Sequence, residues 1–168
     1  MKSFFLFLSV VIPSFILSNE CFQANIISPT PFMGNNDELF KLDNGMIGEV
    51  KYEYEYMYEY YPAVIVCPSK NKMIVKNKNL TIKIINMPTT KNKGESSNII
   101  ESSMDGDFNG WEGETIFKLS NGQIWQQSSY AYTYHYAYSP KVLIIKSGNL
   151  YKMQVEGVSS SINVTRLK

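Results

Sequence analysis

Tyrosine is the residue type best placed to do chemistry in this chain, because eleven of its twelve tyrosines lie in two short stretches. We call these stretches the first ladder (residues 52–61) and the second ladder (residues 130–138). In both, tyrosine alternates with another residue over nine positions. Alternate side chains of a β-strand leave by one face, so five rings of each ladder are expected to share a face. Such a row can stack on the apolar faces of sugars while its hydroxyls bond sugar oxygens.

The residues between the tyrosines indicate which face of each ladder is buried. In the first ladder they are Glu53, Glu55, Met57 and Glu59. Three glutamates cannot form a core, so the rings of the first ladder are expected to point inward over much of its length. In the second ladder the intervening residues are Ala131, Thr133, His135 and Ala137. They are far less decisive about which face of that ladder is buried.

The ligand-binding hypothesis therefore concerns the second ladder and the two tryptophans. Gly110 and Gly113 flank Trp111 and indicate a turn, where an indole would be exposed. The candidate ligand-binding residues are Trp111, Trp125, Tyr130, Tyr132, Tyr134 and Tyr136. The alternative is that these rings pack within the protein's own core.

Acidic residues offer a second chemistry, since glycoside hydrolysis uses two carboxyl groups on opposite sides of a sugar cleft. The acids near Trp111 are Asp105, Asp107, Glu112 and Glu114. The glutamates of the first ladder fit a solvated strand face better, because Ala131 and Thr133 replace two of them in the second ladder. The only histidine, His135, has no strand-turn-helix nucleophile context around it. We therefore expect no catalytic residues and no enzyme, with a carboxylate-based hydrolase as the weaker alternative.

Residues 1–18 have the layout of a secretory signal peptide. Lys2 supplies the positive end, an almost wholly apolar run follows to Leu17, and Ser18 offers a small residue for cleavage. The run is short for a membrane span and contains Pro13. We expect export to the periplasm or the medium, and no membrane span after cleavage.

The mature chain of about 150 residues is electrically neutral and holds two cysteines. Removal of Lys2 lowers the formal net charge from +1 to 0, which gives no electrostatic basis for binding nucleic acid. In an oxidising compartment Cys21 and Cys67 can form a disulfide. The alternative is two unpaired thiols, with Cys67 packed at the end of an apolar strand. No further cysteine or histidine cluster exists, so neither a metal site nor a cofactor is predicted.

Each ladder belongs to a longer pattern that occurs twice. Asn44-Gly45 and Asn121-Gly122 each join two alternating runs, which is typical of a β-hairpin. A ladder, a proline, an apolar strand, a turn and a closing strand follow in the same order in both copies, which indicates an internal duplication.

The duplication divides the chain into four parts. These are a signal peptide (1–18), a first SH3-like β unit (19–85), a linker (86–103) and a second SH3-like β unit (104–168). Pro29 and Pro31 predict that residues 22–32 are irregular. Short strands at this spacing predict an all-β chain of two tandem, small SH3-like antiparallel barrels, and the alternative is one β-sandwich formed by both repeats.

Residues 108–127 read FNGWEGETIFKLSNGQIWQQ. This stretch resembles a family of short, uncharacterised bacterial proteins with an F-x-G-W-x-G-x-T-x-F-x-L-x-N-G-x-x-W-x-Q block, followed by alternating aromatics, a proline and an apolar strand. The resemblance covers about residues 105–167, and the first copy departs from it, with Gly48 where the second has Trp125. It implies bacterial origin and a compact β domain, and it supplies no activity or catalytic residues.

These observations predict an exported, non-enzymatic binding or interaction module of the bacterial envelope. Export and aromatic content make a cell-wall glycan or an envelope protein the expected partner. An inhibitor or immunity protein that covers a partner enzyme is the alternative, besides the hydrolase considered above.

Overall fold

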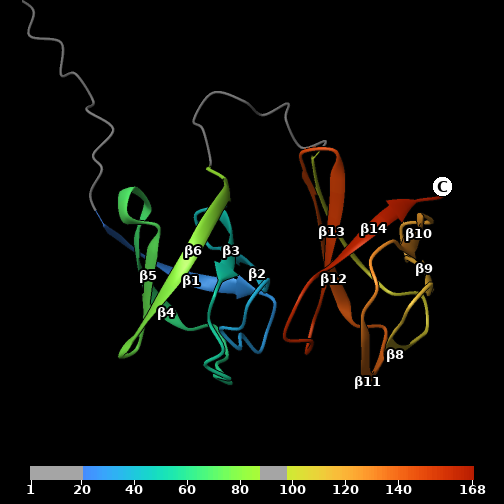
Figure 1. Cartoon of the computed structure of the whole chain (residues 1–168), viewed down its shortest axis with the longest axis horizontal. Helices are drawn as coiled ribbons and strands as arrows, with labels where there is room; N and C mark the ends of the chain where they lie inside the picture. The colour runs from blue at the N-terminus through green and yellow to red at the C-terminus, as the bar shows by residue number, and fades with distance from the viewer. Residues whose placement is uncertain (1–20, 88–97) are drawn as a thin grey trace, which may run out of the picture.

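The computed structural model describes residues 21–87 and 98–168. The predicted signal peptide and the middle of the predicted linker lie outside these residues. Strands are the main regular structure of the described chain, with one 3₁₀ turn, η1 (Pro68–Lys70). The chain forms two units that lie side by side (Figure 1). The all-β prediction is confirmed.

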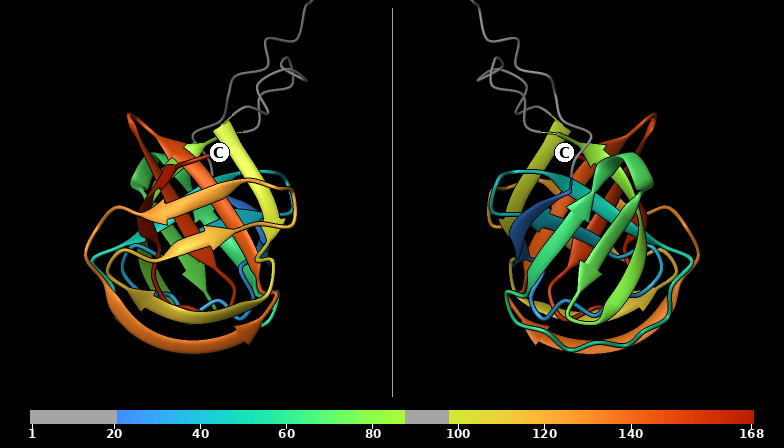
Figure 2. Two further views of the ribbon diagram at one scale, coloured as in Figure 1. Left: turned by 90° about the vertical axis from the view of Figure 1, so that its right-hand side faces the viewer. Right: turned by 90° about the vertical axis from the view of Figure 1, so that its left-hand side faces the viewer.

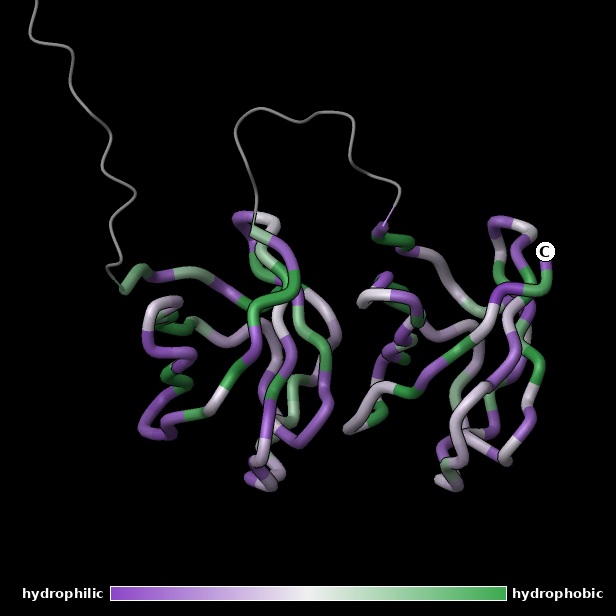
Figure 3. Tube along the Cα trace, turned by 45° about the horizontal axis from the view of Figure 1, so that its top comes forward, coloured by the Kyte–Doolittle hydropathy of each residue, from purple (hydrophilic) through white to green (hydrophobic). Residues whose placement is uncertain are grey.

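The first unit is a closed six-stranded antiparallel barrel. Its strands are β1 (Phe22–Ser28), β2 (Leu39–Leu42), β3 (Ile47–Lys51), β4 (Ala63–Cys67), β5 (Lys72–Val75) and β6 (Lys78–Asn86). They pair in the order β1-β2-β3-β6-β5-β4, and β1 closes the barrel by pairing with both β2 and β4. Hydrophobic and hydrophilic residues interleave along the strands (Figure 3), and the inward set fills the barrel around Phe32 and Phe40.

The second unit is a curled six-stranded sheet with a two-stranded ribbon at one end. Its strands are β7 (Ile99–Ser103), β8 (Asp107–Glu112), β9 (Ile116–Lys118), β10 (Ile124–Gln127), β11 (Tyr132–Tyr138), β12 (Lys141–Ser147), β13 (Leu150–Val155) and β14 (Ile162–Arg166). The sheet order is β7-β12-β13-β14-β10-β9, and β11 pairs with β8. The two edges of the sheet meet at a single bridge between Met104 and Leu119.

Each unit encloses a hydrophobic cluster of its own, which is the arrangement of two small barrels. A third, smaller cluster joins the units through Leu39 and Ile47 of the first and Leu143 and Ile145 of the second.

Both predicted Asn-Gly hairpins are present, and the same contacts form them. Gly45 and Gly122 have φ of 86° and 81°, a region that glycine enters without steric cost. The side-chain oxygens of Asn44 and Asn121 each accept a hydrogen bond from the backbone N–H two residues later, at 2.9 and 3.0 Å.

Two sequence predictions about irregular segments are wrong. Residues 22–28 form β1, because Pro29 and Pro31 fall just after the strand and leave its N–H groups free to pair. Residues 99–103, expected to be linker, form β7, which pairs along its length with β12. Nothing in the local composition of β7 indicates this pairing, which the neighbouring strand decides.

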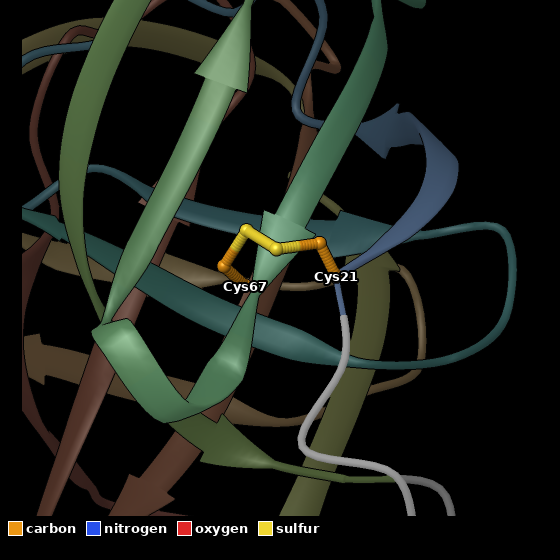
Figure 4. Close-up of a disulfide and its surroundings, with 2 residues drawn as sticks. All are labelled: Cys21 and Cys67. Carbon is orange, nitrogen blue, oxygen red and sulfur yellow. A yellow bond between two sulfur atoms is a disulfide. The ribbon is translucent and has the colours of Figure 1, made fainter.

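The disulfide predicted between Cys21 and Cys67 is confirmed. It joins the residue before β1 to the end of β4, beside the pair Phe22 and Val66 (Figure 4). Within residues 21–87 and 98–168, no helix is long and apolar enough to cross a membrane.

Candidate functional site

All eleven ladder tyrosines are exposed, and the two ladders lie on the same side of the molecule. The exposed fractions run from 58% at Tyr61 and Tyr136 to 90% at Tyr130. The first ladder and β11 lie at the same end of their units in Figure 1, and Figure 2 shows both curving along that end. The structure thus presents two rows of aromatic rings to solvent on one side.

The expectation that the first ladder turns its rings inward is wrong, because its glutamates have partners beneath the ladder. Glu53 accepts a hydrogen bond from the N–H of Thr81 (3.0 Å), Glu55 pairs with Lys78 (2.6 Å) and Glu59 pairs with Lys76 (2.7 Å). These partners come from the β5–β6 hairpin and its turn, and Met57 packs against the barrel core. Half-buried carboxylates that are paired in this way can occupy the inner face, which leaves the outer face to tyrosine.

The first ladder is irregular backbone that a neighbouring segment supports. We call that segment, residues 29–37, the support loop. Tyr52 and Tyr56 have positive φ, and the side-chain oxygens of Asn36 and Asn35 accept hydrogen bonds from their N–H groups at 2.7 and 3.2 Å. Backbone bonds between Phe32 and the ladder complete the pairing. The asparagines therefore hold a backbone that a regular strand would not provide.

The buried carboxyl group of Glu38 fixes the support loop in turn. Glu38 is fully buried, and its carboxyl oxygens accept hydrogen bonds from the N–H groups of Met33 (2.9 Å) and Asn35 (3.1 Å). Burial raises the pKa of Glu38 to about 8, against the lowering effect of these backbone bonds. No pattern in the sequence singles out Glu38, Asn35 or Asn36, since they act only through a loop whose path the sequence does not show.

The second ladder is a β-strand over most of its length, and β8 supports it, with a register shift between Tyr134 and Ala137. Gly110 lies opposite Tyr134, and a Cβ atom there would approach the carbonyl oxygen of Thr133 to 1.8 Å, so only glycine permits this pairing. On the inner face His135 packs against Phe108, with ring centroids 6.3 Å apart. The tyrosines alternate with these inner residues and face outward, as a period of two requires.

The ladders offer rings and hydroxyl groups together, without a formal charge at the outward positions. Tyr58 and Tyr60 are in edge-to-face contact, with centroids 5.8 Å apart. The hydroxyl of Tyr136 donates to the carboxylate of Asp107 (3.1 Å), which raises the pKa of that phenol. A surface of this kind can stack on apolar faces and exchange hydrogen bonds with hydroxyl-rich ligands.

The hypothesis that Trp111 and Trp125 bind a ligand is wrong, because both indoles are buried, at 1% and 0% exposure. Trp111 packs edge-to-face against Phe108 (4.9 Å) and Phe117 (5.5 Å) in the core of the second unit. Gly110 leaves room for the pairing of β8 with β11, and neither Gly110 nor Gly113 turns the indole outward. Of the six candidates, the structure exposes Tyr130, Tyr132, Tyr134 and Tyr136 and places them in one row.

Two of the four acids near Trp111 have side-chain partners, and the other two lie beside the second ladder. Asp105 pairs with Lys118 (2.5 Å), and Asp107 accepts the hydrogen bond from Tyr136. Glu112 and Glu114 are exposed and line an open pocket with Tyr130. In the part of the chain that the structure describes, no group of three or more His, Cys, Asp or Glu residues could hold a metal ion.

Comparison of the chain with protein-family models, with curated proteins and with solved structures gave no match in any of the three.

Proposed function

We propose that this protein is an exported, non-enzymatic binding module of the bacterial envelope, and that its tyrosine ladders contact a cell-wall glycan. The observation that carries the proposal is the exposure of eleven tyrosines in two rows on one side of the molecule. Exposed aromatic surface of this extent is costly in water and marks interaction sites in soluble proteins. Tyrosine is also suited to binding sugars, since its ring can stack on the apolar face of a sugar and its hydroxyl can form a hydrogen bond with a sugar oxygen.

Three further features support export from a bacterial cell and the division of the chain into two duplicated units. The Cys21–Cys67 disulfide fits an oxidising compartment, as the signal-like residues 1–18 do. The resemblance of residues 108–127 to a bacterial family supports a bacterial origin. Two small barrels with the same motif order support the duplication of one SH3-like unit.

The test is co-sedimentation of the purified mature chain with isolated peptidoglycan. Tyr132→Ser/Tyr134→Ser/Tyr138→Ser removes three exposed rings from the second ladder while leaving its supports in place. Ile116→Ser is the matched control, because Ile116 is also exposed (61%) but lies on β9, outside the ladders. We expect the triple variant to lose at least tenfold in affinity and the control to bind as the wild type does. Equal binding by all three proteins would refute the proposal.

The alternatives predict different results in the same preparation. A hydrolase would release soluble fragments from peptidoglycan, and Glu112→Gln/Glu114→Gln would abolish the release. An inhibitor or immunity protein would leave peptidoglycan unbound and would co-purify from the native envelope with one enzyme whose activity it lowers. Tyrosine is enriched at protein interfaces as well, which is the feature that favours this second alternative.

A further inference from the structure

The two units are packed against each other at a fixed orientation. Leu39 and Ile47 of the first unit and Leu143 and Ile145 of the second form a buried apolar cluster. Beside it, the backbone N–H of Leu39 donates to the side-chain oxygen of Gln154 (3.1 Å), and both residues are buried. A buried hydrogen bond within an apolar contact fixes the register of the two surfaces as well as their proximity.

A group of charged residues around the buried Glu49 lies beside this contact. Glu49, which is 1% exposed, pairs with Lys51 of its own unit (3.0 Å) and with Lys152 of the second unit. Asp37 pairs with Lys51 (2.5 Å). Burial acts to lower the pKa of Lys51, but hydrogen bonds from it to Asp37 and Glu49 raise that pKa overall. The pair between Lys152 and Glu49 spans the interface, and separation of the units would break it.

The turn between β13 and β14, residues 156–161, contacts the supports of both ladders. On the first unit, the N–H and the hydroxyl of Ser161 both donate to the backbone oxygen of Asp37, at 3.1 and 2.6 Å. Asp37 is the last residue of the support loop. On its own unit, Gly157 lies against His135 beneath the second ladder, where a Cβ on the glycine would be 2.7 Å from Nε2. One short turn therefore connects the undersides of the two tyrosine rows.

From this geometry we propose that the two ladders act as one binding surface for a single extended, neutral polysaccharide chain that contacts both units at once. This inference rests on the proposed function and specifies its ligand. Both ladders lie on the same side of the molecule with their rings exposed, and the packed interface fixes their relative position.

The repetition within the rows indicates a repeating ligand. A folded protein partner presents a non-repeating set of contacts, and interfaces with such partners concentrate the binding energy in a few residues near their centre. Here the same side chain recurs at alternate positions in both rows, so a polymer of like units meets the same contact at each step. The outward positions carry no formal charge, which suits hydroxyl and amide groups better than anionic ones.

Simultaneous contact with both rows has a measurable consequence. Once a chain is bound to one row, its second contact is intramolecular, and overall affinity can exceed that of either row by about 10²–10⁴-fold. Between Tyr132 and Tyr138 the second ladder is about 20 Å long, at the usual rise of a strand. Oligosaccharides of this length can cover one ladder. The two ladders run alongside each other (Figure 2), so a chain that contacts both must lie across the rows, from one unit to the other.

The experiment measures affinity against chain length. Size-fractionated chitin oligosaccharides serve as the probe, since they are neutral and repeat N-acetylglucosamine, and binding is followed by calorimetry on the mature chain. The ladder-one variant is Tyr54→Ser/Tyr58→Ser/Tyr60→Ser, the ladder-two variant is Tyr132→Ser/Tyr134→Ser/Tyr138→Ser, and Ile116→Ser is the control. Far-UV circular dichroism and urea midpoints verify that each protein is folded.

We expect the wild type to bind chains long enough to lie across both rows at least about 100-fold more tightly than short chains that contact only one row. Either ladder variant should bring long-chain affinity down to the short-chain value, while short-chain affinity changes by about twofold, since the other ladder still binds. Length-independent affinity would overturn the inference of a shared surface and leave the proposed function standing. Absence of binding at every length by the wild type would overturn the sugar ligand, and unchanged binding by both ladder variants would overturn the proposed function itself.

Discussion

The disulfide between Cys21 and Cys67 is expected to supply a large share of the stability of the first unit. The perturbation is Cys21→Ser/Cys67→Ser, which removes the bond and leaves no thiol, because the structure pairs both cysteines of the chain. In the folded barrel, pairing of β1 with β4 already holds the two ends together. The bond therefore acts mainly on the unfolded chain, whose freedom it restricts.

The magnitude follows from the sequence separation of 46 residues. Closing a loop of this length removes conformational entropy equivalent to about 4 kcal/mol at 25 °C. With a urea m-value of about 2 kcal/mol/M, the midpoint of unfolding should fall by about 2 M. A contribution of about 4 kcal/mol from the disulfide is a substantial part of the roughly 5–15 kcal/mol by which a folded domain is usually stable.

Two optical signals make the assay specific to each unit. Trp111 and Trp125 both lie in the second unit, so indole fluorescence reports that unit, whereas far-UV circular dichroism reports both. The urea midpoint of the dichroism transition should fall by the full shift of about 2 M. The fluorescence transition should follow it if the interface around Leu39 and Leu143 couples the units, and it should stay in place if they unfold independently.

The controls are single variants and reduction. Cys21→Ser and Cys67→Ser should each have the same effect as the double variant, and dithiothreitol should lower the wild-type midpoint to the same value without changing the double variant. A shift of the dichroism midpoint below about 0.5 M would refute the reasoning, since it would mean that loop closure contributes little to this barrel.

Two further predictions concern the supports of the ladders. The raised pKa of Glu38 means that the folded state binds more protons than the unfolded state between pH 4.5 and about 8, so wild-type stability should fall by about 3 kcal/mol from pH 5 to pH 8. Glu38→Gln should remove most of that fall in urea titrations at the two pH values, and an equally steep fall in the variant would contradict the assignment. Gly110→Ala should destabilise the second unit by about 3 kcal/mol or more, because it combines a φ of 109° with a backbone contact at 1.8 Å. Gly113→Ala is its control, with a φ of 98° and open space around the added methyl, and it should cost about 1 kcal/mol; similar losses in the two variants would show that strain and not contact decides.

The sequence alone predicted the features that depend on neighbouring residues. The period of two identified the strand character of β11, the Asn-Gly pairs identified two hairpins, and the number of cysteines left one disulfide to form. Each of these rests on backbone geometry or on residues that meet over a short span. The order of motifs likewise predicted two small all-β units.

The sequence did not predict which face of a ladder is buried. A row of glutamates is a poor core in isolation, so the first tyrosine row was expected to turn inward. The β5–β6 hairpin supplies Lys76, Lys78 and the N–H of Thr81 to those glutamates. A buried or half-buried carboxylate is acceptable only when such partners are present, and these partners come from a strand pair that lies beyond the ladder in the chain.

The tertiary structure also decided what becomes of the two tryptophans and where the rows lie. The indoles of Trp111 and Trp125 fill the core of the second unit, although the glycines near Trp111 indicated an exposed turn. Contacts between Asp37 and Ser161 and between Glu49 and Lys152, more than 100 residues apart in the chain, fix the two ladders on one side. Composition and spacing determined that tyrosine would form rows; packing between distant segments determined that the rows face solvent together, because only the folded chain brings their supports into contact.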